Sequence, residues 1–132
     1  MRPIKFRAWD GITKNMVPVK SLYFEQDGKA GCAVDIEDIN GDLESEWSLM
    51  QYTGIKDKNN IEIYEDDVVI AKSVRSMVGM VIFSKGQWLI ENSVTRDTQS
   101  MDLGVFELIG NIYENPDLQK VVMIMDSDDK LN

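Results

Sequence analysis

The chain has 132 residues, of which 43% are hydrophobic and 28% charged, a balance that fits one globular domain and excludes a disordered, collagen-like or membrane-spanning chain. Its 23 acidic and 14 basic residues give a net charge of −9, which repels phosphate, so nucleic-acid binding would need a local basic patch. Histidine is absent, Cys32 has no cysteine to pair with, and no signal-peptide pattern follows Met1, so we expect a cytosolic protein without an internal disulfide.

Period-2 alternation near the N-terminus predicts a first strand over residues 3–9. One face of this strand carries Ile4, Phe6 and Ala8, and the other carries Lys5, Arg7 and Trp9. A second extended stretch lies within residues 16–24. Two cations beside a tryptophan form a candidate interaction surface that suits a nucleic-acid backbone with a stacked base. The alternative, which the net charge favours, is an intramolecular role in which this basic face meets the acidic segment Glu25–Glu46 of the same chain.

The main charge run of the chain extends from Glu25 to Glu46 and contains eight acidic residues against one basic residue. Spacing from Asp35 to Glu46 resembles a calcium loop, but Ile39 and Asn40 occupy positions that need a ligand and a turn glycine. We therefore interpret the run as a solvated acidic face without a metal. Its central members form a second candidate interaction surface: Asp35, Glu37, Asp38, Asp42 and Glu44.

Short β-like runs joined by turns fill the rest of the recognisable chain. Residues 47–55 and 61–64 flank an Asn/Asp loop, and residues 80–83 and 87–90 flank Ser84–Gly86, whose glycine supplies a positive φ. A last strand over residues 106–113 contains a glycine that favours a bulge. This pattern predicts a mainly β fold with a small antiparallel SH3-like barrel and an additional N-terminal β region, with a β-rich α+β fold as the alternative.

We expect one β-rich domain over residues 1–116, made of an N-terminal β region (1–66) and the small barrel (67–116), followed by a C-terminal extension (117–132). The extension contains five apolar residues in a row, Val121–Met125, before an acidic end. Such a run should not stay in water, so it either packs back on its own barrel or crosses to another subunit. Of these two options the sequence favours the second, a homo-oligomer through residues 121–125.

No catalytic constellation is present in the sequence. Cys32 has no histidine to activate it, and the Gly-x-Ser-x-Gly and phosphate-binding glycine motifs do not occur. Asp66 and Asp67 are adjacent, so their side chains should point to opposite faces and act as turn residues rather than as a magnesium site. We therefore predict no enzyme, no cofactor and no metal.

Three stretches in order carry a family resemblance: Ile4–Asp10, Leu49–Asn59 running on to Ile63–Glu65, and Ile109–Pro116. Together they resemble the YopX family of small phage and prophage proteins. Family members tend to carry glycine where this chain has Asn60 and Asp66, two residue types that tolerate left-handed backbone. The resemblance implies a β-rich fold, a phage or prophage origin and hence the cytoplasm of a bacterial host cell, and it brings no catalytic residue or cofactor with it.

These observations favour a non-enzymatic phage or prophage accessory protein that binds a host or phage protein and no membrane. One alternative is a nucleic-acid-binding small barrel that uses Lys5, Arg7 and Trp9, which the net charge disfavours. Another is an acidic mimic of nucleic acid that uses the run around Asp38.

Overall fold

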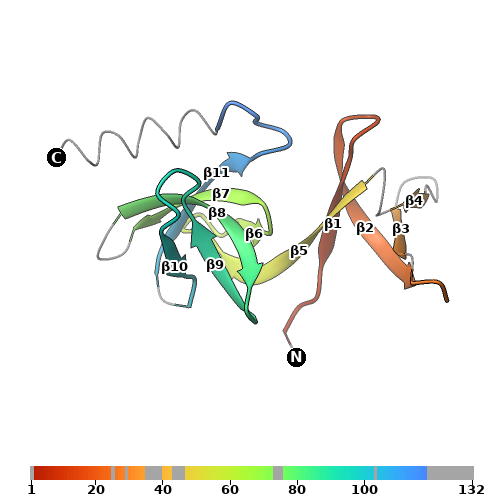
Figure 1. Ribbon diagram of the computed structural model, residues 1–132, viewed down its shortest axis with the longest axis horizontal. Helices are drawn as coiled ribbons and strands as arrows, with labels where there is room; N and C mark the ends of the chain where they lie inside the picture. The colour runs from red at the N-terminus through yellow and green to blue at the C-terminus, as the bar shows by residue number, and fades with distance from the viewer. Residues whose placement is uncertain are drawn as a thin grey trace. The chain divides into compact units, whose positions relative to one another are not determined.

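The computed structural model describes residues 2–24, 26–28, 30–34, 40–42, 47–72, 76–102 and 104–118. Within these ranges the fold is built from antiparallel β-strands, which confirms the predicted mainly β class (Figure 1). The strands are β1 (Phe6–Asp10), β2 (Asn15–Phe24), β3 (Ala30–Val34), β4 (Asn40–Asp42), β5 (Trp47–Lys56), β6 (Glu62–Tyr64), β7 (Asp67–Lys72), β8 (Ser76–Ser84), β9 (Gln87–Glu91), β10 (Thr98–Ser100) and β11 (Phe106–Asn111).

Two compact units divide the chain, Met1–Tyr52 and Thr53–Asn132, and β5 begins in the first and ends in the second. One sheet has the strand order β4-β3-β2-β1-β5-β6, and the other has the order β10-β9-β8-β7-β11. The division expected from the sequence after residues 66 and 116 stays a prediction.

The first unit is organised around β1, which pairs with β2 on one side and β5 on the other. Ala8 stands opposite Val17 and Leu49, so these side chains share one face, and Ala8 is fully buried with Trp47 in a small apolar cluster. The alternation predicted for this strand is therefore present, but β1 begins only at Phe6. Ile4 lies before the first paired residue of the strand and is 61% exposed.

The five-stranded sheet of the second unit is apolar on both faces. One face holds the larger core cluster of the described residues: Ile63, Val69, Ala71, Val81, Ile90, Met101 and Phe106. Val68 and Val78 are buried on the opposite face, packed against half-buried side chains that include Ile70 and Leu118. Both faces of this sheet therefore take part in packing.

Local backbone geometry follows the glycine signals in the sequence. Ser84 pairs with Gln87, so the β8–β9 hairpin turns through Lys85 and Gly86, whose φ values are +51° and +82°. Two successive positive φ values define a type I′ turn, which matches the twist of the flanking strands. The register also shifts between Leu108 and Gly110, which is the bulge expected in β11.

Among the residues that the structure describes, the sheets are not closed into a barrel, so the expected SH3-like closure is not found there. The physical reason lies at the outer edge of β11, where closure would require another strand. There the Asp57 carboxylate accepts the Leu108 amide at 3.1 Å, and the Lys58 amide donates to the Phe106 carbonyl at 2.8 Å. The β5–β6 loop thus occupies the hydrogen-bonding groups that a closing strand would use.

Candidate interaction surface

The basic and aromatic residues singled out in the sequence lie together on one face. Arg7 stands opposite Pro18 and Met50, and Trp9, two positions further along β1, stands opposite Met16 and Ser48. Lys5 precedes the strand by one residue, and its carbonyl accepts the Tyr52 amide at 2.8 Å. Because side chains two apart share a face of a strand, Lys5, Arg7 and Trp9 form one surface, which we call the β1 basic face.

Neighbouring side chains position both cations of the β1 basic face. The Lys5 ammonium lies 5.8 Å from the centroid of the Tyr52 ring, within the range of a cation–π interaction. The Arg7 guanidinium donates a hydrogen bond from Nε to the Met50 sulfur at 3.4 Å. The aromatic ring and the sulfur thus restrict the side-chain freedom that a partner would otherwise have to remove.

The members of the β1 basic face differ in exposure. Lys5 is exposed, Arg7 and Trp9 are half-buried, and Met50 and Tyr52 on the neighbouring strand β5 are buried. Trp9 thus packs partly within the protein and leaves part of its indole accessible. A half-buried tryptophan beside an arginine has the composition typical of residues that contribute most to protein interfaces.

The acidic candidate surface lies almost wholly beyond the described part of the chain. Asp35, Glu37, Asp38 and Glu44 are outside the described residues, as is the apolar run Val121–Met125. Asp42 belongs to β4 and pairs with Gly31 of β3. The described residues therefore bring together the basic candidates only.

A second group of polar residues, most of which the sequence analysis did not single out, holds the turns together. Asp57 is its clearest member, being buried after the end of β5 with 6% of its surface exposed. Its Oδ1 accepts the amides of Asn59 and Ile61 at 2.8 and 2.9 Å, and its Oδ2 accepts that of Leu108. Burial raises the pKa of Asp57, but these three amides and the nearby Lys58 charge together hold the pKa below its ordinary value.

Asp66 and Asp67 also serve a turn, as the sequence predicted. Asp67 is buried, and its Oδ2 accepts the Tyr64 amide at 2.7 Å, whereas Asp66 Oδ2 accepts the Tyr113 hydroxyl at 3.1 Å. The two carboxylates therefore have different partners. No group of three or more acidic, cysteine or histidine side chains among the described residues is arranged to hold a metal ion.

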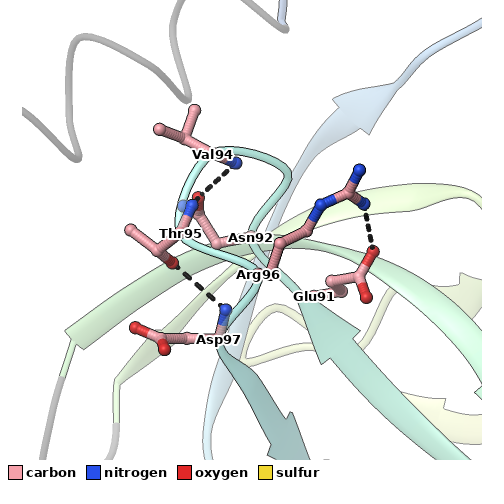
Figure 2. A network of polar contacts seen from close by, with 6 residues as sticks. All are labelled: Glu91, Asn92, Val94, Thr95, Arg96 and Asp97. Carbon is pink, nitrogen blue, oxygen red and sulfur yellow. Dashed lines mark hydrogen bonds and ion pairs between the residues drawn. The ribbon is translucent and has the colours of Figure 1, made fainter.

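Asn92 closes the turn between β9 and β10 in the same way. Its side-chain oxygen accepts the amides of Val94 and Thr95 at 2.9 and 3.0 Å. Figure 2 shows this oxygen of Asn92 beside the two residues. Its Nδ2 donates to the Val78 carbonyl at 3.0 Å, which ties the turn to β8. An ion pair of 3.4 Å between Arg96 and Glu91 spans the same turn (Figure 2).

Asp10 at the end of β1 and Asn111 at the end of β11 complete this set. Asp10 Oδ2 accepts the Thr13 hydroxyl at 2.7 Å, and this bond is the main cause that lowers the pKa of Asp10. Asn111 Oδ1 accepts the amides of Tyr113 and Glu114 at 3.0 and 2.8 Å. An Asp or Asn at the end of a predicted strand, or directly after it, is the sequence signal that could have identified these turns.

One charged cluster lies on the outer strand of the second unit. Glu107 bridges two lysines, with Oε1 3.3 Å from Lys58 Nζ and Oε2 3.0 Å from Lys72 Nζ. Hydrogen bonding to Glu107 raises the pKa of Lys72, and the bonds from Lys72 and then Lys58 lower the pKa of Glu107. These groups are partly exposed, so the cluster contributes little to stability.

Comparison with known proteins identifies the family to which this chain belongs. Residues 5–120 match the family model described as YopX protein. The chain belongs to the YopX family. This match spans both compact units, and the turn residues Asp57, Asp66 and Asn111 lie within it.

Two solved structures share the YopX fold of this chain. Protein EF1440 from Enterococcus faecalis is 23% identical, with a TM-score of 0.65 over 90% of this chain and 99% of that one. Protein yopX from Bacillus subtilis is 24% identical, with a TM-score of 0.61 over 89% of this chain and 98% of that one. A comparison with curated proteins found no match. Among the described residues no helix is long and apolar enough to span a membrane.

Proposed function

We propose that this member of the YopX family is a non-enzymatic interaction module that binds a host or phage protein through the β1 basic face. The observation that carries the proposal is the alignment of Lys5, Arg7 and Trp9 on one face, with Tyr52 and Met50 positioning the two cations. The matching partner surface carries carboxylates beside an apolar side chain, since two cations and an indole complement that pair.

A protein partner fits the charge of the chain better than nucleic acid does. The net charge of −9 opposes the approach of a polyanion, whereas a short acidic segment of a protein interacts mainly with the local charge of Lys5 and Arg7. Arginine also binds a carboxylate through two parallel hydrogen bonds, which gives such a contact a defined geometry. A phage protein or a protein of the infected host could supply this segment.

Quantitative affinity capture from phage-infected host lysate tests this function. Immobilised wild-type protein is compared with Lys5→Glu/Arg7→Glu and with Lys56→Glu/Lys85→Glu, which changes the net charge equally at two exposed lysines of the second unit. We expect a protein that the wild type and the Lys56/Lys85 variant enrich equally and that the Lys5/Arg7 variant does not. Equal capture by all three chains, or no captured protein in repeated experiments, would overturn the proposal.

Nucleic-acid binding through the same face is the second candidate, because a basic strand face with an aromatic residue also suits a stacked base. Filter binding of single-stranded DNA and RNA at low salt separates the two functions. Binding that falls steeply as salt rises and disappears in Lys5→Glu/Arg7→Glu would favour nucleic acid. The protein-binding function predicts no retention on the filter at any salt concentration.

A further inference from the structure

One face of the five-stranded sheet in the second unit is apolar, and none of the described strands packs across the whole of it. We call it the Val68 face. In register, Val68 pairs with Met80 and Ile82 pairs with Leu89, so side chains of three neighbouring strands share it: Val68, Ile70, Val78, Met80, Ile82 and Leu89. Val68 and Val78 are only 2% and 6% exposed, while the others are half-buried.

Charged groups lie at the margin of this face rather than at its centre. Glu107, opposite Ile70, lies on the edge strand β11, and Glu91, opposite Met80, lies at the end of β9. The centre formed by β7 and β8 is apolar. A centre without charge accepts an apolar segment, and it would penalise a charged partner by desolvation.

The described part of the chain ends on this same face. After Asn111 the chain turns, and the side chains of Ile112 and Leu118 pack against the cluster around Val68 and Val78. Fourteen residues, 119–132, follow Leu118 outside the described ranges, and five of them form the apolar run Val121–Met125. Three residues span at most about 10 Å, which is about two strand spacings, so the run begins within reach of β7 and β8.

We propose that Val121–Met125 pack against the Val68 face of the same chain. A tethered segment competes with a second chain at an effective concentration of about millimolar, so covering the face within one chain is favoured over exchange between subunits. The sequence alone favoured a crossing to another subunit, because it gave no sign of a route back to the sheet. Leu118, packed on that face, supplies the route.

Point variants test whether Val121–Met125 pack on the Val68 face without removing this segment from the chain. Val122→Glu places a charge in the apolar run, and Ser127→Glu adds the same charge to the polar end as a matched control. We expect Val122→Glu to lower Tm by about 5–10 °C and to raise the fluorescence of a bound hydrophobic dye, with Ser127→Glu within about 2 °C of the wild type. In methyl NMR spectra the signals of Val68, Ile70 and Val78 should shift more than those of Val69 and Val81, which lie on the opposite face.

The wild-type chain separates cover within one chain from cover between chains. If the segment packs on its own sheet, Tm does not change over a hundredfold range of protein concentration, and light scattering gives the same mass for the wild type and Val122→Glu. A Tm that rises with concentration, together with a smaller mass for Val122→Glu, would overturn the proposal in favour of an intersubunit contact. Chemical-shift changes spread equally over both faces of the sheet, or a Tm of Val122→Glu equal to that of the wild type, would also overturn it. Should Val122→Glu fail to fold, the concentration dependence of the wild type decides alone.

Discussion

Replacing Asp57 tests whether a single carboxylate holds the β5–β6 loop against β11. Asp57→Ala leaves the amides of Asn59, Ile61 and Leu108 without their acceptor. Leaving one amide without its acceptor costs at least about 1 kcal/mol. For the three amides together we expect the free energy of unfolding to fall by about 3 kcal/mol. At about 4 °C per kcal/mol for a domain of this size, Tm should fall by about 12 °C.

Asp57→Asn refines this prediction, because it keeps the shape of the side chain. Its oxygen can still accept the amides of Asn59 and Ile61, but its NH₂ group faces the Leu108 amide, so two donors meet. We expect an intermediate loss of about 1–2 kcal/mol. The exposed Asp102, replaced by alanine, serves as the control.

The pH dependence of this effect has a defined sign. The pKa of Asp57 is lowered in the folded protein, so its contribution is present above the unfolded pKa of about 4 and is lost as pH falls through the lower folded value. The difference in Tm between the wild type and Asp57→Asn, measured by thermal unfolding, should therefore narrow as pH falls from about 6 to about 3. An Asp57→Ala variant that melts within about 2 °C of Asp102→Ala would refute the reasoning.

Three further changes can be checked by thermal unfolding. Asn60 has a φ of +68°, so Asn60→Gly should raise stability by about 0.5 kcal/mol and Asn60→Val should lower it by about 1–2 kcal/mol; equal Tm values would contradict this. A Cβ on Gly79 would clash with Ile90 Cγ2 and lie 2.9 Å from the backbone oxygen of Glu91, so Gly79→Ala should cost about 2–3 kcal/mol, and an unchanged Tm would show that the strands can move apart. Glu107→Gln removes the ion pair with Lys72, so its small loss of Tm should disappear in 1 M salt, and a loss that persists there would indicate packing instead.

Strand positions could be predicted from the sequence because hydrophobic alternation and turn residues are local signals. The face assignment of Ala8 and Arg7 and the positive φ of Gly86 follow from period 2 and from turn chemistry. Barrel closure could not be predicted in this way, because it depends on which groups occupy a sheet edge. The bond from Leu108 to Asp57 joins residues 51 positions apart, and no local pattern reveals it.

The candidate site, too, could be predicted only in part from local sequence signals. Alternation alone placed Lys5, Arg7 and Trp9 on one face, but the partners of the cations, Tyr52 and Met50, come from a strand more than forty residues later. Asp57 and Asn111 lie in the stretches that carry the family resemblance, and their side chains accept hydrogen bonds from backbone amides of turns. In this account those residues build the fold, and the binding surface lies on β1.

The most direct test of this assignment, in which the turn residues build the fold and β1 carries the binding surface, uses the partner recovered by the wild-type chain. Its affinity is measured by calorimetry for Arg7→Glu and Asp57→Asn, at a temperature where thermal unfolding shows both variants to be folded. Loss of one buried charge pair costs 2 kcal/mol or more at an interface, so Arg7→Glu should bind at least about thirtyfold more weakly, while Asp57→Asn should bind within about twofold of the wild type. Unchanged binding by Arg7→Glu, with loss of binding by folded Asp57→Asn, would contradict the account and place the interaction surface at the turns.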